Sequence, residues 1–337
     1  MTLRELLKEG SDALTRYHVP EAELCARLLL CNAFGRSTAE YLLDCDKDLS
    51  ELMDSDESSE RIDQYEALLN ERANRRPMEQ ILGEAQFMGL TFSVNEDVLV
   101  PRQDTETLVE AVLSDVPQKN IRLLDMCTGS GCIALSLFVL GGYEDVVAAD
   151  LSRKALYVAQ SNGARLKEEA KALREESQQG MRQGMSGRQR RGASPFFVQN
   201  ERRADTFEPQ LHFVQSDLFR DLRPAMDELG YDAFDVITAN PPYIRTKDID
   251  TLEPEVRDYE PRMALDGAED GLAFYRRIAK EAVPYLADGG RLYLEIGADE
   301  AADVSALLQD AGFSDIEVIK DLACKDRVVK ARYDRKI

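Results

Sequence analysis

The stretch Ile121–Asp150, "IRLLDMCTGSGCIALSLFVLGGYEDVVAAD", decides the fold. An apolar run that ends near Asp125 is followed by a glycine-containing turn, an apolar segment of helical length and a second apolar run that ends in Asp150. A strand, a tight turn, a helix and another strand make a βαβ unit, whose two strands run parallel. The stretch therefore predicts a parallel sheet with helices on its faces.

The same alternation continues on both sides of this stretch. The expected elements are helices at 107–113, 152–167 and 304–313, strands at 211–217, 233–240 and 291–297, and a closing hairpin at 314–333. Alternating strands and helices imply a mainly parallel sheet that is covered on both faces. Residues 101–337 are therefore predicted to form a doubly wound α/β domain.

Two segments before this domain and one segment inside it have different patterns. Residues 1–75 carry apolar residues at helical spacing and predict a small helical bundle, and residues 76–100 read as a β-hairpin linker. Residues 167–210 are rich in Gln, Gly, Arg and Ser, which predicts a flexible insertion. A packed subdomain, or an arm that touches RNA or a partner through "RQRRGAS", is the alternative for this insertion.

The composition excludes several classes of protein. A formal net charge of −21 argues against a duplex-wrapping protein, so no direct nucleic-acid binding is expected. The six cysteines form no CxxC pair and are expected to be reduced thiols, and with only two histidines no metal site is expected. No leader pattern and no apolar run of membrane length is present, so we expect a cytoplasmic protein without a membrane partner.

Polar residues end four successive strands of the predicted sheet: Asp125, Asp150, Asp217 and Asn240. Ligands of open parallel sheets bind beyond the carboxyl ends of the strands. Gly129 and Gly131 allow a tight turn close to a ligand, and Asp150 follows at the spacing at which a carboxylate accepts from ribose hydroxyls. These residues predict a nucleoside site, although such glycines can also be purely structural.

The third polar strand end leaves two interpretations open. Asp217 could accept from the exocyclic amine of an adenine, with Leu218 against the ring. Aspartate is also among the best helix N-caps, so a capping role is equally compatible with the residue.

The fourth strand end reads "NPPY" over Asn240–Tyr243. Pro241 and Pro242 end the strand ladder and fix an extended backbone. The side-chain carbonyl of Asn240 and the main-chain carbonyl of Pro241 are two acceptors for one planar NH₂ group, and Tyr243 could cover its face. Because these residues offer no general base, the electrophile must already be activated, as a sulfonium methyl group is. A rigid turn with a core tyrosine is the plainer interpretation.

The sequence resembles the release factor glutamine methyltransferases (the HemK or PrmC family) within the class I S-adenosylmethionine-dependent methyltransferases. The resemblance rests on "NPPY" together with "PRQDTETL", "LLDMCTGSGCIAL", "EPRMALDGAEDGL" and "LYLEIG", and it extends over nearly the whole chain. It implies a Rossmann-like seven-stranded sheet. It also implies methyl transfer from S-adenosylmethionine to the glutamine amide of the Gly-Gly-Gln motif of class 1 peptide chain release factors.

The resemblance also assigns roles to individual residues. The residues implied to hold S-adenosylmethionine are Asp125, Cys127, Thr128, Gly129, Ser130, Gly131, Asp150, Asp217, Leu218 and Asn240. The residues implied to hold the glutamine are Leu99, Pro101, Asn240, Pro241, Pro242 and Tyr243, of which Asn240, Pro241 and Tyr243 are the catalytic set. Arg102 and Glu106 flank this region, where surface ion pairing is an equally good interpretation. Glu295 is expected to end a neighbouring strand and only to support the site.

The chain departs from the family pattern in two places. Cys127 takes the first glycine position of the loop D-x-G-x-G-x-G, where a side chain is tolerated if φ is negative. The insertion around 178–199 is not a usual part of the pattern. The N-terminal bundle is expected to recognise the substrate protein, with a purely stabilising cap as the alternative.

Three other functions remain as alternatives. A nucleic-acid adenine N6-methyltransferase would use the same two acceptors on a flipped base, but it should carry a basic cleft. A nicotinamide-dependent oxidoreductase would fit Gly129, Gly131, Ala134 and Asp150 but leaves "NPPY" unexplained. A non-catalytic module that binds translation factors would not need an intact Asn240–Tyr243.

Overall fold

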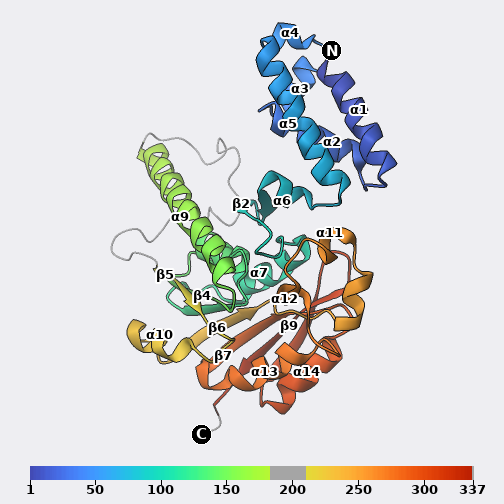
Figure 1. Ribbon diagram of the computed structural model, residues 1–337. Helices are drawn as coiled ribbons and strands as arrows, with labels where there is room; N and C mark the ends of the chain where they lie inside the picture. The colour runs from blue at the N-terminus through green and yellow to red at the C-terminus, as the bar shows by residue number, and fades with distance from the viewer. Residues whose placement is uncertain (183–209, 336–337) are drawn as a thin grey trace. The chain divides into compact units, whose positions relative to one another are not determined.

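The computed structural model describes residues 1–182 and 210–335, and the chain folds into two compact units (Figure 1). The first unit comprises Met1–Glu84 and Thr251–Tyr259, and the second comprises Ala85–Asp250 and Glu260–Ile337. The first unit therefore extends beyond the expected boundary at residue 75 and takes in a distant segment of the chain. Only the start of the expected linker belongs to it.

The first unit is a helical bundle, as the apolar periodicity predicted. Its helices are α1 (Leu3–Arg16), α2 (Ala22–Ala33), α3 (Thr38–Asp44), α4 (Leu49–Leu52), α5 (Ser55–Ala73) and α6 (Met78–Leu82). Thr2 and Glu5 close α1 with a capping box, in which each side chain accepts from the backbone N–H of the other residue. Leu29 and Tyr65 are buried between the helices. Burial of this apolar face holds the short helices together.

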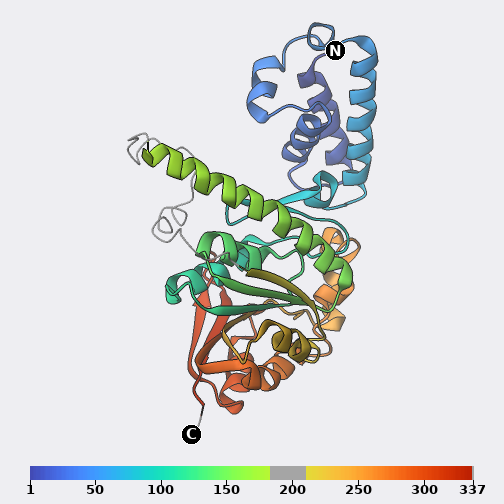
Figure 2. The same cartoon turned by 90° about the vertical axis from the view of Figure 1, so that its left-hand side faces the viewer.

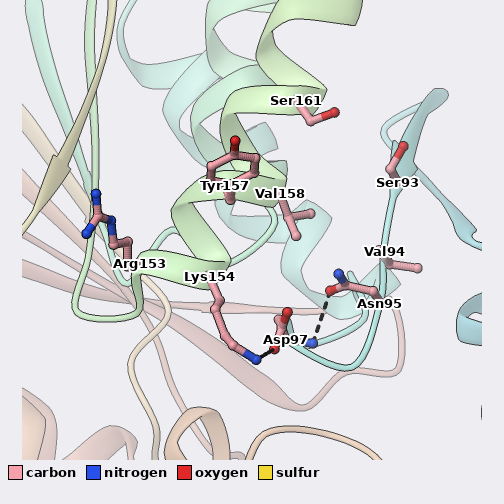
Figure 3. A pocket seen from close by; sticks show the side chains of 9 residues that line it. All are labelled: Ser93, Val94, Asn95, Asp97, Arg153, Lys154, Tyr157, Val158 and Ser161. Carbon is pink, nitrogen blue, oxygen red and sulfur yellow. Dashed lines mark hydrogen bonds and ion pairs between the residues drawn. The ribbon is translucent and has the colours of Figure 1, made fainter.

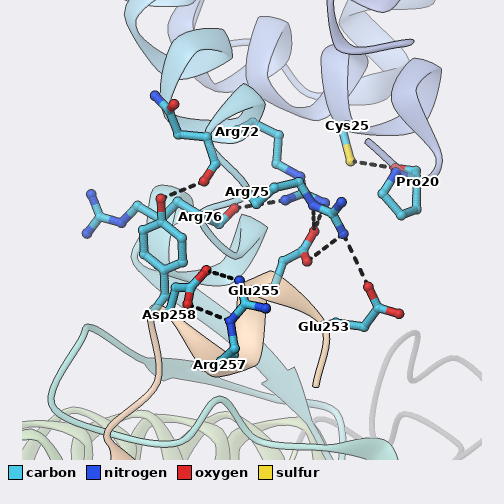
Figure 4. A network of polar contacts seen from close by, with 11 residues as sticks. Pro20, Cys25, Arg72, Arg75, Arg76, Glu253, Glu255, Arg257 and Asp258 are labelled. Carbon is cyan, nitrogen blue, oxygen red and sulfur yellow. Dashed lines mark hydrogen bonds and ion pairs between the residues drawn. The ribbon is translucent and has the colours of Figure 1, made fainter. Parts of the chain in front are cut away.

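An ion-pair network holds Thr251–Tyr259 in the first unit (Figure 4). Glu255, in the short helix α11 (Pro254–Arg257), accepts from Arg75 at 2.7 Å and pairs with the buried Arg72 at 2.9 Å. The Tyr259 hydroxyl donates to the carbonyl of Asn74 at 2.6 Å. Since Arg72 is buried, its pairing with Glu255 satisfies a charge that would otherwise be costly.

The second unit is built on a seven-stranded sheet in the order β5-β4-β3-β6-β7-β9-β8. The strands are β3 (Arg122–Met126), β4 (Asp145–Asp150), β5 (Gln210–Gln215), β6 (Phe234–Ala239), β7 (Leu286–Glu295), β8 (Ser314–Lys320) and β9 (Asp326–Tyr333). The first five pair in parallel, and β9 is antiparallel to both β7 and β8. The expected mainly parallel sheet and closing hairpin are thus confirmed. From β3 the chain adds β4 and then β5 on one side of the sheet, and it then crosses back to place β6 on the other side of β3. The topological switch point therefore lies between β3 and β6.

Helices cover both faces of the sheet (Figure 1). Neighbouring residues of a strand face opposite sides, and apolar residues of the central strands are buried on both sides. Leu124 and Ile237 pack on one face with α10 (Leu222–Leu229), α13 (Ala273–Glu281) and α14 (Ala301–Asp310). Leu123 and Val236 pack on the other face with α7 (Gln103–Asp115), α8 (Cys132–Ser136), the π-helical turn η1 (Leu137–Gly141) and α9 (Arg153–Arg182). The result is a three-layer domain with an apolar core on each side of the sheet.

The hairpin expected over 76–100 is present but shorter, with β1 (Glu84–Phe87) and β2 (Leu90–Ser93) paired as a two-stranded sheet. The segment 244–285 contains short helices that the sequence did not indicate: η4 (Thr246–Thr251), α11, α12 (Arg262–Leu265), α13 and η5 (Val283–Tyr285). All six cysteines are free thiols, as expected. In the described part of the chain, no helix has the length and apolarity needed to cross a bilayer.

The prediction of a flexible insertion over 167–210 is wrong for its first residues. The helix α9 continues to Arg182, as Figure 2 shows for the long green helix. The residues beyond 167 include many strong helix formers, and Arg165 pairs with Glu169 one turn later at 2.7 Å. The remainder of the predicted insertion, 183–209, lies outside the described residues.

Candidate functional site

The register of the sheet gathers the polar strand ends into one row. Near their carboxyl ends β4, β3, β6 and β7 pair in register. The next residues form a row across this edge in the order Asp150, Cys127, Asn240 and Glu295. The row passes over the switch point between β3 and β6, where ligands of open parallel sheets bind. The sequence prediction that these strand ends meet is therefore correct for Asp150 and Asn240.

The glycine loop after β3 is held from below by Asp125. The two carboxyl oxygens of Asp125 accept from Thr128 Oγ1 at 2.6 Å and from Thr238 Oγ1 at 2.7 Å. Complete burial raises the pKa of Asp125 to about 7, although these hydrogen bonds oppose the rise. Asp125 thus supports the loop and is not exposed to a ligand, which corrects its expected role as a cofactor contact.

Cys127 has φ 60°, so the condition under which a side chain is tolerated at this position, a negative φ, is not met. In this conformation the Thr128 N–H donates to the carbonyl of Ala149 at 3.0 Å, one strand away. A non-glycine residue pays about 1–2 kcal/mol in this region. Burial also raises the pKa of the Cys127 thiol well above its usual value. Cys127 is therefore a protonated thiol in a strained position at the centre of the row.

Asp150 connects the glycine loop to the second strand. Its carboxylate accepts from the Gly129 N–H at 2.9 Å and from the Ser152 N–H at 2.8 Å. Burial raises the pKa of Asp150, and these backbone donors oppose the rise. Each carboxylate oxygen keeps further acceptor capacity, since each can accept two hydrogen bonds. Leu151, the next residue, is 52% exposed and offers an apolar surface beside it.

A cavity of about 260 Å³ opens over this row. The predicted residues that line it are Leu99, Pro101, Cys127, Thr128, Gly129, Ser130, Asp150, Asp217, Leu218, Asn240 and Pro242. Asp125, Gly131, Pro241 and Tyr243 are not part of the lining. Pro241 is buried, and Tyr243 is half-buried against the apolar core on one face of the sheet. The structure thus brings together most of the predicted set but not all of it.

Carboxylates outnumber basic side chains in the lining of the cavity. Among the described residues, four carboxylates line the cavity, at Asp97, Asp150, Asp217 and Asp266, beside the one guanidinium of Arg102. Arg102 is itself paired with both oxygens of Glu260 at 2.8 Å. Asp97, Asp217 and Asp266 are also ion-paired, with Lys154, Arg277 and Arg262. In the part of the chain that the structure describes, Asp150 is thus the lining carboxylate without a cationic partner, and its charge favours a cationic ligand over a phosphate. In residues 1–182 and 210–335, no three His, Cys, Asp or Glu side chains gather in the way that a metal ion requires.

Asp217 does not cap the helix that follows it. The N-cap of α10 is Asp221, and the Asp217 carboxylate instead accepts from Arg277 of α13 at 2.7 Å. This ion pair uses one oxygen and leaves the other for the cavity. The capping interpretation is therefore wrong, and Arg277 is a positioning partner that the sequence did not indicate. Leu218 follows with φ 49°, which turns the chain at the cavity wall.

The side chain of Asn240 has two distinct surroundings. Its Nδ2 donates to Thr105 Oγ1 of α7 at 3.5 Å, whereas the residue lines the cavity. Because an amide has one donor end and one acceptor end, a buried NH₂ leaves the carbonyl oxygen toward the cavity. Asn240 therefore presents an acceptor to a ligand.

Two flanking residues that the sequence left open have internal partners. Arg102 pairs with the buried Glu260, which also accepts from the Val100 N–H at 3.3 Å and so fixes the segment that carries Leu99. Glu106 accepts from the Met88 N–H in the β1–β2 turn at 2.6 Å. Arg102 therefore makes an ion pair, with a buried partner, whereas Glu106 binds a backbone N–H. The lining residues Pro261, Met263, Ala264 and Asp266 also escaped prediction, although they lie in the stretch "EPRMALDGAEDGL", and Phe274 lies just beyond it.

A second, shallower hollow lies beside the first, between α9 and the chain after β2 (Figure 3). Lys154 pairs with Asp97 at 2.9 Å, and the Asp97 N–H donates to Asn95 Oδ1 at 3.0 Å. Tyr157 projects from the same face of α9. Asp97 also lines the deeper cavity, so the two hollows share one wall.

A sheet of this order, with β9 entering antiparallel between β7 and β8 and an acidic cavity over its carboxyl edge, is the arrangement of class I methyltransferases. The family described as "PrmC N-terminal domain" matches residues 5–83 of the helical unit. A release factor glutamine methyltransferase of Clostridium botulinum is 33% identical over 335 residues, which cover 98% of this chain and 99% of that one. The chain belongs to the release factor glutamine methyltransferase family.

Two further relatives of the same name agree with this assignment. The protein of Caulobacter vibrioides is 33% identical over 98% of this chain and 96% of its own length. The protein of Clostridium acetobutylicum is 38% identical over 80% of this chain and 79% of its own length. The relatives thus match both units, and the family that the sequence resembled is confirmed.

Proposed function

We propose that this protein transfers a methyl group from S-adenosylmethionine to the side-chain amide nitrogen of the glutamine in the Gly-Gly-Gln motif of class 1 peptide chain release factors. The observation that carries the proposal is Asn240, whose carbonyl end is left toward an acidic cavity while its NH₂ is held by Thr105. An amide nitrogen is a weak nucleophile because its lone pair is delocalised. Acceptors for its two N–H groups increase the electron density on nitrogen and fix its direction.

The residues of the cavity fit S-adenosylmethionine. Asp150 would accept from ribose hydroxyls, Leu151 and Leu218 would contact the adenine, and Asp217 would accept from its amine. The loop Cys127–Gly131 would pass under the rest of the molecule. The acidic lining suits a sulfonium and an ammonium group, whereas the pyrophosphate of a nicotinamide cofactor would be repelled. When bound, S-adenosylmethionine supplies an activated methyl group.

Asn240 and the main-chain carbonyl of Pro241 would hold the glutamine amide, and Leu99 and Pro101 would line its path. Glu260 keeps this path in place through Val100 and Arg102. Correct alignment of nucleophile and methyl group is the main contribution that these residues can make, and it is worth about 7–11 kcal/mol in well-oriented reactions. Tyr243 lies outside the lining, so it would support Asn240 from behind.

Transfer of labelled methyl to an intact class 1 release factor tests the proposal. The controls are a release factor whose Gly-Gly-Gln is changed to Gly-Gly-Asn and an adenine-rich oligonucleotide. Label on the unchanged factor alone supports glutamine as the acceptor. Label on the oligonucleotide would move the protein to the adenine N6-methyltransferases and refute the proposal.

The helical unit would recognise the substrate protein, because a tripeptide offers far less than the roughly 1,600 Å² of a standard interface. Leu42 and Leu43 of α3 are 65% and 77% exposed and suit such a contact. Changing both to serine should raise KM for the intact factor but leave KM for a Gly-Gly-Gln peptide unchanged. A stabilising cap, the alternative role, would show no difference between the two substrates.

A further inference from the structure

The carboxyl group of Glu295 is buried with an unmet hydrogen-bonding requirement. The residue ends β7 and is 2% exposed, and its Oε2 has no hydrogen-bond partner. Its main-chain oxygen accepts from the Tyr275 hydroxyl at 2.8 Å, so the backbone is fixed independently of the carboxyl. A buried carboxylate with an unpaired oxygen costs stability and calls for a role other than structure.

The sheet register places this carboxyl beside Asn240. Ala239 pairs with Leu294, and the next residues of the two strands are Asn240 and Glu295. Thr105 and Asn240 lie close enough to the Glu295 carboxyl to lower its pKa as hydrogen-bonding neighbours, so both favour its ionised form. Hydrogen bonds that favour a carboxylate are the ones that it accepts. The NH₂ of Asn240 therefore faces both Thr105 and Glu295.

An ionised carboxylate can only accept hydrogen bonds, so it distinguishes the two ends of a neighbouring amide. If Asn240 turned over, its carbonyl oxygen would face the negative charge of Glu295 and its NH₂ would enter the cavity. Thr105 cannot impose this preference, because a hydroxyl both donates and accepts.

We propose that Glu295 is a positioning residue whose carboxylate holds the NH₂ of Asn240 in the interior and so fixes the Asn240 carbonyl as the acceptor for the substrate amide. This inference rests on the function proposed above. Glu295 does not line the cavity and acts through Asn240 alone. Replacement of Glu295 should lower kcat, because the carboxylate affects the alignment of the reacting amide.

The same arrangement predicts a pH dependence. Burial raises the pKa of Glu295 to about 7, against the hydrogen bond of Thr105 and the charge of Arg327. The charged and titratable groups that face it are Arg327 of β9, Asp104 of α7, Tyr243 after β6, Tyr275 of α13 and Cys132 of α8. Below pH 7 the protonated carboxyl can donate to a carbonyl and the preference for one amide orientation is lost. The rate should therefore rise as pH increases through about 7.

The experiment compares the full-length wild type with Glu295→Gln, which keeps the shape but can donate. Expected are a kcat about 10–100-fold lower, KM for the release factor and Kd for S-adenosylmethionine within threefold, and no loss in Tm. The rising limb of kcat near pH 7 should disappear. Glu300→Gln is the matched control: Glu300 is also buried with a pKa raised to about 7, but it accepts from the Gly297 N–H at 2.9 Å and has no bond to Asn240.

Each outcome decides the proposal. A Glu295→Gln enzyme with kcat within threefold of wild type overturns it, as does one that loses kcat together with Tm or cofactor affinity. Persistence of the pH limb in Glu295→Gln, or its loss in Glu300→Gln, also overturns it. A wild type that binds S-adenosylmethionine but does not methylate the release factor would instead reject the proposed function, and the positioning role with it.

Discussion

Two glycines of the loop after β3 should respond differently to substitution by alanine. Both have positive φ, 56° at Gly129 and 84° at Gly131. A Cβ at Gly131 would lie 2.9 Å from Leu135 Cδ1 and 3.2 Å from Ala159 Cβ, where α8 meets α9. A Cβ at Gly129 would meet nothing within 4 Å and would enter the open space of the cavity that this residue lines. One substitution should therefore disturb packing, and the other should disturb binding.

The magnitudes follow from these contacts. Left-handed backbone costs alanine about 1–2 kcal/mol at either position, offset by about 0.4–1 kcal/mol because alanine restricts the unfolded chain. Gly131→Ala adds overpacking of about 1–3 kcal/mol. We expect a loss of about 2–3 kcal/mol in the free energy of unfolding for Gly131→Ala and about 1 kcal/mol for Gly129→Ala. Gly129→Ala should weaken S-adenosylmethionine at least tenfold, which corresponds to about 1.4 kcal/mol.

Urea unfolding and calorimetric titration of the two full-length variants measure both quantities. The Kd of folded Gly131→Ala should stay within about threefold of wild type, because its Cβ points away from the cavity toward α9. Equal losses of stability in the two variants, or a larger loss of affinity in Gly131→Ala, would refute the reasoning about the loop.

Four further changes test other parts of the structure. Asn240→Ala should abolish methyl transfer and leave the Kd for S-adenosylmethionine within about tenfold, as followed by label transfer and calorimetry. In the wild type, the pKa of Asp125 is raised from 3.8 to about 7 on folding, so the folded state binds its proton more tightly. The free energy of unfolding should therefore fall as pH rises from 4 to 7, by up to about 1.4 kcal/mol per pH unit. Asp125→Asn should remove this pH dependence, as measured by urea unfolding at several pH values. Cys127→Gly should raise the free energy of unfolding by about 0.5–1 kcal/mol in urea, because it relieves the left-handed strain. Glu255→Ala should cost about 3 kcal/mol by thermal unfolding, against less than about 1 kcal/mol for the 78% exposed Glu253, because only the former leaves the buried Arg72 unpaired.

Most of the sheet could be predicted from the sequence because its strands are apolar runs bounded by turns or polar residues. The segment 244–285 could not, because its helices are short and two of them begin at or after a proline, Pro254 and Pro261. The length of α9 was underestimated because the residues beyond 167 are highly charged and lack an apolar stripe.

The residues of the candidate site also divide into those that the sequence could predict and those that it could not. Asp150 and Asn240 were found because the polar end of a strand is visible in the sequence itself. Thr105, Glu260 and Arg277 were not found, because each acts on a residue 60 or more positions away, and no local pattern records such a pairing. The positive φ of Cys127 also depends on a neighbouring strand, through the bond from Thr128 to Ala149.

The membership of Thr251–Tyr259 in the helical unit has a consequence for genetic exchange. The polypeptide passes between the two units at three points, after Glu84, after Asp250 and after Tyr259. A recombination event or a designed graft that transfers only the first 84 codons would leave Arg72 and Arg75 without Glu255. A working chimera must exchange two separate gene segments together, so this unit can diversify by point substitution far more readily than by shuffling.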